Sequence, residues 1–169
     1  YLVATIHRAE NTDNLDNLIH IMEALHRIAQ SKRVVIPLHP RTRHIVAHNS
    51  NLKQLTRNLD IIEPQGYLEM MKLLAGCDQV IPDSGGLQKE AFFSGKISLI
   101  TRTETEWIEL VESGYAFVCG SDTETIWNHY QMSNTYHPDF SRKIYGDGQA
   151  SCKILQILLH HTTAVSHAL

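Results

Sequence analysis

Short apolar runs alternate with segments of helical periodicity along almost the whole chain, and this alternation restricts the fold more than any other feature. The apolar runs are typical of strands that are buried on both faces. The predicted strands comprise residues 1–6, 33–38, 61–62, 79–82, 97–101 and 116–119. The predicted helices comprise residues 15–30, 43–48, 67–75, 87–93, 106–112, 122–132 and 149–161. Strands and helices that alternate in this way predict an α/β fold with a doubly wound, Rossmann-like parallel sheet.

Length and composition narrow the class of protein further. We predict a single domain over residues 1–169, because this length suits one ordinary hydrophobic core. The net charge of −3 argues against nucleic-acid binding, and no apolar run is long enough to predict a membrane span, so a cytoplasmic protein is expected. The three cysteines form no Cys-x-x-Cys pair, and neither a metal nor a cofactor is expected. Tyr1 stands inside an apolar run, which favours a piece of a longer protein.

Polar side chains follow the predicted strands at the points where the strands end. In doubly wound sheets, ligands bind outside the carboxyl ends of the strands, so these segments are expected to converge on one site. They are His7-Arg8, His39-Pro40-Arg41, Gln65-Gly66-Tyr67, Asp83-Ser84-Gly85-Gly86 and Arg102-Thr103-Glu104.

The fourth of these segments has the pattern of a phosphate site. Ser84, Gly85 and Gly86 predict a tight turn whose backbone N–H groups point at an anion, at the start of a helix from about residue 87. Glu90 lies four residues after Gly86 on the same helix face, where its carboxylate could accept hydrogen bonds from ribose hydroxyls. A nucleotide-sugar site is the functional interpretation, and a plain turn before a capped helix is the alternative.

Several motifs together resemble the non-hydrolysing UDP-N-acetylglucosamine 2-epimerases. They are Thr5-Ile6-His7-Arg8-Ala9-Glu10-Asn11, His39-Pro40-Arg41-Thr42, the stretch 83–91, Arg102 with Thr105-Glu106, and Tyr145-Gly146-Asp147-Gly148. The resemblance implies that the chain is the C-terminal, nucleotide-sugar-binding domain of a two-domain glycosyltransferase B type fold. It further implies a UDP-sugar substrate, the N-terminal domain of the same protein as a partner, and a homodimer.

The resemblance also implies roles for individual residues. His7 is similar to a histidine that the family needs for activity, either as an acid or base or as a phosphate ligand. His39 and Arg41 are expected near the diphosphate, Tyr67 beside the uracil, and Arg102 against the nucleotide sugar. Ser84, Gly85, Gly86 and Glu90 match the phosphate loop and the ribose ligand of the family.

Four of these assignments have structural alternatives, and the alternative for His7 is a histidine that caps a loop. Arg41 could be a solvated side chain, and Tyr67 could be a packing residue at a helix start. Arg102 could instead form an ion pair with Glu104 or Glu106.

The implied reaction interconverts UDP-GlcNAc and UDP-ManNAc through elimination and re-addition of UDP. By the same resemblance, the acid and base carboxylates belong to the N-terminal half, so this chain alone is expected to bind UDP weakly without turnover. The stretch Thr105-Glu106-Trp107-Ile108-Glu109 is similar to relatives that act on UDP-diacetamido uronic acids, which leaves the sugar open. A glycosyltransferase of the same architecture and a non-catalytic nucleotide-sugar sensor are the alternative functions.

Overall fold

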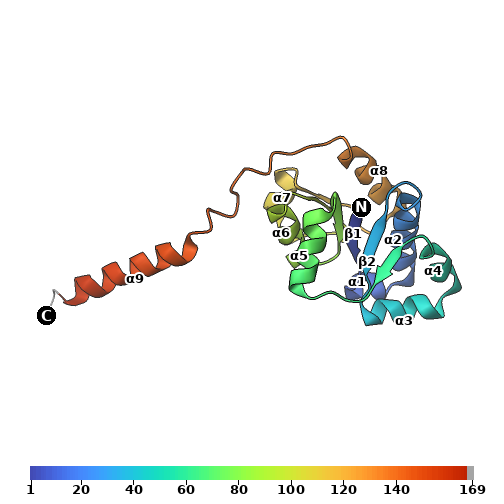
Figure 1. Ribbon diagram of the computed structural model, residues 1–169, viewed down its shortest axis with the longest axis horizontal. Helices are drawn as coiled ribbons and strands as arrows, with labels where there is room; N and C mark the ends of the chain where they lie inside the picture. Colours follow the sequence, from blue (N-terminus) through green and yellow to red (C-terminus); the bar gives the residue numbers. More distant parts are fainter. Residues whose placement is uncertain (167–169) are drawn as a thin grey trace.

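Six strands form one parallel sheet in a computed structural model that describes residues 1–166 (Figure 1). The strands are β1 (Leu2–Thr5), β2 (Val34–Pro37), β3 (Asp60–Ile62), β4 (Gln79–Pro82), β5 (Ile97–Ile100) and β6 (Ala116–Val118). Their order is β3-β2-β1-β4-β5-β6, so the winding reverses between β1 and β4. This order confirms the predicted doubly wound parallel sheet, and it places the expected ligand crevice at the ends of β1 and β4.

The helices agree with the predicted ones in most places and differ at some ends. They are α1 (Ala9–Thr12), α2 (Leu15–Ile28), α3 (Pro40–His48), α4 (Ser50–Leu55), α5 (Tyr67–Gly76), α6 (Gly85–Phe93), α7 (Ile108–Glu112), α8 (Thr123–Ser133) and α9 (Ala150–Ser166). The sequence did not predict α1 or α4. Helix α3 begins earlier than predicted because Pro40 suits the first helical turn and His39 caps it.

The core lies on both faces of the sheet, and β1 shows how alternation produces it. Leu2 and Ala4 point into the larger cluster with α2, α3, α4 and α8, whereas Val3 packs on the other face with α5 and α6. All three side chains have no exposed surface. Because both faces are covered, the strand is apolar except at the buried Thr5 rather than alternately polar.

The segment after α8 returns along the sheet before it leaves the domain. Phe140 and Tyr145 pack against Phe92, and the hydroxyl of Tyr115 donates to the carbonyl of Asp139 at 2.6 Å. Beyond this anchored segment, α9 lies apart from the sheet in Figure 1. Within residues 1–166, no helix combines the length and apolar character needed to cross a membrane.

Thr42 joins α3 to the end of β1. Its hydroxyl has no exposed surface and donates to the carbonyl of Ile6 at 2.7 Å, one residue before His7. The substitution Thr42→Val keeps the shape of the side chain but leaves that carbonyl buried without this donor. We expect a loss of about 1–2 kcal/mol in the free energy of unfolding, measured by urea denaturation.

Thr135→Val is the matched control, because the hydroxyl of Thr135 donates to a carbonyl in an exposed setting. Water can replace that bond, so the control is expected to change stability by less than about 0.5 kcal/mol. Equal urea midpoints for Thr42→Val and the wild type would show that the Thr42 bond contributes nothing.

Candidate functional site

A cavity of about 320 Å³ opens at the carboxyl edge of the sheet, where the winding reverses. It is lined by residues from the ends of β1 and β4, the segment before α5, and helices α5 and α6. These residues are Thr5, His7, Gln65, Gly66, Tyr67, Met70, Ser84, Gly86, Leu87 and Glu90. The structure therefore brings together His7, Tyr67, Ser84, Gly86 and Glu90, five of the nine predicted site residues, and we call this space the carboxyl-edge cavity.

The first turn of α6 has unused hydrogen-bond donors. Helices α2, α3, α4 and α8 are each capped by a side chain that accepts backbone N–H groups. Ser84 occupies the N-cap position of α6, yet its side chain makes no such bond. Within the described residues, no group accepts the N–H of Gly85 or Gly86. An anion in the cavity could take these donors and the positive end of the helix dipole.

The two glycines of this turn differ in what surrounds them. Neither has a positive φ, and both belong to α6, so the helix begins at Gly85 rather than at the predicted residue 87. A Cβ at Gly85 would lie 3.0 Å from Oε2 of Glu106, whereas a Cβ at Gly86 would meet nothing within 4 Å. The open space beside Gly86 is where a ligand could approach the backbone. These glycines therefore matter because they lack a side chain, and they do not form the tight turn that was predicted from the sequence.

Glu90 and Tyr67 border the same cavity with uncommitted side chains. In the described residues, the carboxylate of Glu90 has no hydrogen bond and no ion pair, although the side chain is half-buried. The ring of Tyr67 is 65% exposed at the start of α5, which leaves its face free to stack. These positions suit the predicted contacts to ribose and base.

Asp83 ties the ends of β1 and β4 together beneath the cavity. Its side chain has no exposed surface, and Oδ2 accepts the backbone N–H groups of His7 at 2.6 Å and Arg8 at 2.7 Å. Oδ1 lies 3.1 Å from Nδ1 of His7. The sequence analysis placed Asp83 in the motif but gave it no role. The sequence feature that indicates such a role is a carboxylate directly after a buried strand, because a buried charge needs a hydrogen-bond or ion-pair partner.

Asp83 also changes the titration of His7. The hydrogen bond from Nδ1 to Asp83 raises the pKa of His7, and partial burial opposes this shift. The protonated form of His7 therefore stabilises the fold below the unfolded pKa of about 6.5, and this contribution is lost as the pH rises through the folded pKa. A larger fraction of His7 is therefore protonated near neutral pH than of a free histidine, and the carboxylate of Asp83 balances that charge.

His39 and Arg41 lie beside the carboxyl-edge cavity but do not line it. The ring of His39 is 6.1 Å from that of His7, and its Nδ1 accepts the N–H of Arg41 at 3.3 Å as the cap of α3. The guanidinium of Arg41 forms an ion pair with Asp13. Contacts of both side chains to a diphosphate stay predictions.

Arg102 forms the ion pair that the sequence analysis gave as its alternative role. It is 8% exposed, and Nη1 lies 2.9 Å from both carboxylate oxygens of Glu106. This hydrogen bond raises the pKa of Arg102 and lowers that of Glu106. Glu106 lies against Gly85, so the ion pair between Arg102 and Glu106 supports the first turn of α6. A direct contact to the nucleotide sugar stays a prediction.

Trp107 is a further residue of the site that sequence reasoning missed. The predicted helix over residues 106–112 included it, but it is the N-cap of α7, and its indole N–H donates to the carbonyl of Gly85 at 2.8 Å. Thr105 donates to Oε1 of Gln88 at 2.6 Å, and Nζ of Lys89 lies 3.6 Å from the Trp107 ring centroid. The segment before α7 therefore holds α6 at three points.

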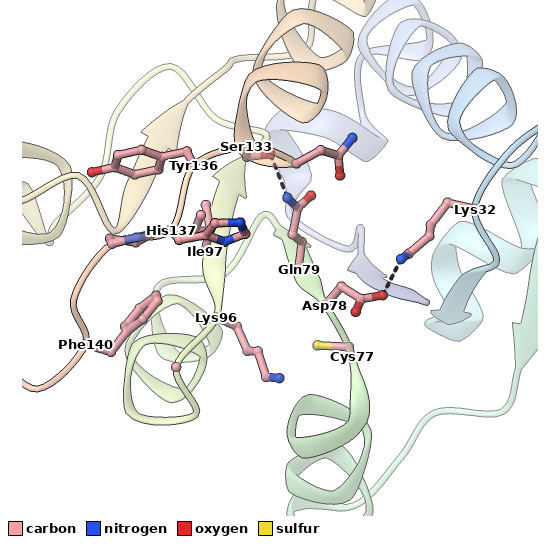
Figure 2. Close-up of a pocket in the computed structure, with 13 residues that line it drawn as sticks. Lys32, Cys77, Asp78, Gln79, Lys96, Ile97, Ser133, Tyr136, His137 and Phe140 are labelled. Atoms are coloured by element: carbon pink, nitrogen blue, oxygen red, sulfur yellow. Dashed lines mark hydrogen bonds and ion pairs between the residues drawn. The ribbon is translucent and has the colours of Figure 1, made fainter.

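A second cavity, of about 470 Å³, lies at the opposite edge of the sheet, near the start of β4 (Figure 2). Lys32 and Asp78 neutralise each other there at 2.6 Å. Gln79 donates to Ser133 at 2.7 Å, and its Oε1 is buried without a partner among the described residues. The cavity lies at the amino ends of β4 and β5, next to the residues that follow α6 and away from the first turn of that helix. We therefore assign the candidate site to the smaller carboxyl-edge cavity.

The reversed winding, and the uncapped first turn of α6 beside a cavity at the carboxyl ends of β1 and β4, define a Rossmann-like α/β domain. The profile of the UDP-N-acetylglucosamine 2-epimerase family matches residues 1–159. The chain belongs to this family, as its motifs predicted.

Individual relatives agree with this assignment. The chain is 42% identical over 159 residues to the UDP-2,3-diacetamido-2,3-dideoxy-D-glucuronate 2-epimerase of Pseudomonas aeruginosa, covering 94% of this chain and 44% of that protein. It is 36% identical to a UDP-N-acetylglucosamine 2-epimerase homolog of Methanococcus maripaludis, again covering 94% and 44% of the two chains. The chain thus spans less than half of the length of these relatives.

Solved structures match over the same share. The UDP-GlcNAc 2-epimerase of Methanocaldococcus jannaschii superposes with a TM-score of 0.87 at 30% identity, covering 95% of this chain and 45% of that one. The enzyme of Neisseria meningitidis, solved bound to UDP-GlcNAc, gives a TM-score of 0.77 at 30% identity, with 94% and 44% covered. These matches confirm the predicted Rossmann-like domain of a glycosyltransferase B type fold.

Proposed function

We propose that this chain is the UDP-binding part of a UDP-sugar 2-epimerase, with the diphosphate at the first turn of α6 and the ribose on Glu90. The observation that carries the proposal is the uncapped first turn of α6, which lines one cavity together with His7 and Glu90. Membership of the epimerase family and the resemblance to an enzyme solved with UDP-GlcNAc support it.

The residues of this chain suit the departure of UDP rather than the chemistry at carbon 2. Negative charge grows on the diphosphate as its bond to the sugar breaks, and donors aimed at that charge lower the barrier. The N–H groups of Gly85 and Gly86, the hydroxyl of Ser84 and the imidazole of His7 are such donors. Removal of a proton at carbon 2 needs a base, which we assign to the rest of the longer protein.

The proposed substrate is a UDP-sugar with an acetamido group at carbon 2. The names of the Pseudomonas aeruginosa relative and of the Methanococcus maripaludis homolog both describe such a sugar. UDP-GlcNAc, with UDP-ManNAc as its epimer, and a UDP-diacetamido uronic acid are therefore the two candidates. The family match favours epimerisation over the glycosyltransferase and sensor alternatives. A homodimer and an N-terminal domain as partner remain predictions from the motif resemblance.

Glu90→Gln tests the ribose contact. A neutral amide accepts hydroxyl hydrogen bonds less strongly than a carboxylate does, so we expect calorimetry to show about 10-fold weaker UDP binding. The wild type is expected to bind 2′-deoxy-UDP about 10-fold more weakly than UDP, and Glu90→Gln is expected to distinguish the two less. This coupling is specific to a contact between Glu90 and the ribose.

Glu112→Gln is the control, because Glu112 is exposed at the end of α7 and does not line the cavity. It is expected to bind UDP like the wild type. Wild-type chain that shows no saturable UDP binding would overturn the proposed function. Equal discrimination against 2′-deoxy-UDP by Glu90→Gln and the wild type would overturn only the ribose assignment.

A further inference from the structure

Asp83 is a fully buried carboxylate with two distinct sets of contacts. Oδ2 takes two backbone N–H groups, from His7 and Arg8, while Oδ1 faces only one group, Nδ1 of His7. Oδ1 is buried and accepts no hydrogen bond from the described residues, so its 3.1 Å ion-pair contact to Nδ1 of His7 is its only polar contact there. A buried carboxylate oxygen that is left to one imidazole nitrogen has a strong preference for a proton on that nitrogen.

We propose that Asp83 is a positioning residue that holds the proton of His7 on Nδ1 and turns Nε2 toward the carboxyl-edge cavity. This inference rests on the proposed function only for its consequence in catalysis. The orientation itself follows from the contacts: His7 lines the cavity, and its Nδ1 is on the side of Asp83.

The backbone contacts make the orientation rigid. Oδ2 fixes the main chain of His7 and Arg8 at 2.6 and 2.7 Å, and the N–H of Asp83 donates to the carbonyl of Thr5 at 3.1 Å. The imidazole and its carboxylate are therefore held at the adjacent carboxyl ends of β1 and β4. A histidine without these contacts would sample several rotamers, so its imidazole would be in the catalytically competent orientation for a smaller fraction of the time.

Other charged groups near His7 would not set the same tautomer. Arg8 is adjacent in sequence and disfavours a positive imidazole, and the His39 ring stands 6.1 Å away. Glu90 lines the far part of the same cavity. Only Asp83 contacts a ring nitrogen of His7 as an ion pair among the described residues.

The consequence concerns the diphosphate. With Nδ1 protonated and held by Asp83, a second proton on Nε2 gives an imidazolium whose charge the carboxylate balances. That Nε2–H can donate to a phosphate oxygen as UDP departs. The neutral form that Asp83 holds has a lone pair on Nε2 and would act as a base, whereas the raised pKa of His7 favours the protonated donor, so the pH profile of turnover distinguishes the two roles that the sequence left open.

The substitution Asp83→Asn distinguishes the effect of Asp83 on the His7 tautomer from its contribution to the backbone conformation. The amide oxygen of asparagine can still accept the N–H groups of His7 and Arg8, whereas its NH₂ group donates where the carboxylate accepted. The variant therefore keeps the backbone contacts, but it favours the His7 tautomer that has a lone pair on Nδ1 and a proton on Nε2.

Nitrogen-15 NMR of the histidines in this chain reads the tautomer directly. In the wild type we expect His7 to carry its proton on Nδ1 and to titrate above its ordinary pKa. In Asp83→Asn we expect the proton on Nε2 and a lower His7 pKa than in the wild type. Asp122→Asn is the control, since Asp122 also accepts a backbone N–H but caps the distant α8.

In the longer protein, Asp83→Asn is expected to lower turnover about 10-fold or more and to move the pH profile toward acid, with less change in the KM. A wild-type His7 with its proton on Nε2 would overturn the proposal, and this holds even if Asp83→Asn does not fold. So would a folded Asp83→Asn variant with an unchanged tautomer and pKa. The tautomer does not depend on UDP, so a failure to bind UDP would count against the proposed function alone.

Discussion

The substitution Gly86→Leu is expected to weaken UDP binding by about 100-fold or more while the fold remains intact. A side chain at this position points into open space, since a Cβ there would meet nothing within 4 Å. That open space is the part of the carboxyl-edge cavity where a diphosphate would approach the first turn of α6. Loss of the charge-assisted hydrogen bonds to the backbone would cost about 2–3 kcal/mol, which corresponds to this fold-change.

Stability and binding should change in opposite directions in this variant. Position 86 has a helical backbone without a positive φ, so leucine, a better helix former than glycine, is expected to stabilise α6 slightly. Calorimetry with UDP and urea denaturation of the same preparation measure the two effects. Gly86→Leu that binds UDP like the wild type would place the diphosphate elsewhere.

Gly85→Ala is the matched control at the neighbouring position. Its Cβ would lie 3.0 Å from Oε2 of Glu106 and 3.4 Å from Nε1 of Trp107, both of which hold the turn from behind. We therefore expect Gly85→Ala to lower stability by about 1 kcal/mol and to weaken UDP binding less than Gly86→Leu does. The different effects of the two substitutions would then follow from the surroundings of each glycine, which are Glu106 and Trp107 at Gly85 and open space at Gly86.

The sequence predicted the fold because each local signal agreed with the others. The run from Leu2 to Ile6 is apolar except at Thr5, as suits a strand covered on both faces, and the structure buries every residue of it. Helix ends were less predictable. Ser84 and the glycines after it suggested a turn, yet the backbone enters the helix at Gly85 because nothing there needs a positive φ.

Long-range partners were the part of the site that the sequence could not supply. Asp83 meets His7 across 76 positions, and Trp107 reaches back 22 positions to the carbonyl of Gly85. No periodicity encodes such contacts, because they follow from the order of the strands and the path of the loops. Arg102 shows the same limit, since only the fold decides whether its guanidinium meets Glu106 or a ligand.

The substitution His7→Ala is expected to reduce turnover by the longer protein about 100-fold to 10,000-fold, with a much smaller change in UDP affinity. The imidazole lines the cavity beside the first turn of α6, and its charge is balanced by Asp83. A donor of this kind stabilises the diphosphate most when negative charge develops on it, so its loss should appear in kcat rather than in KM. Steady-state kinetics of epimerisation measure this division.

The pH dependence of turnover shows whether His7 acts in its protonated, positively charged form or in its neutral form. Because the pKa of His7 is raised by Asp83, an imidazolium donor stays protonated above the ordinary value of about 6.5, and turnover should fall as the pH rises through the folded pKa. A general base at this position would give the opposite limb, with turnover rising over the same range. His20→Ala, which removes an exposed histidine of α2, should leave the profile unchanged. A His7→Ala variant with wild-type kcat would remove His7 from the catalytic machinery, whichever limb the wild type shows.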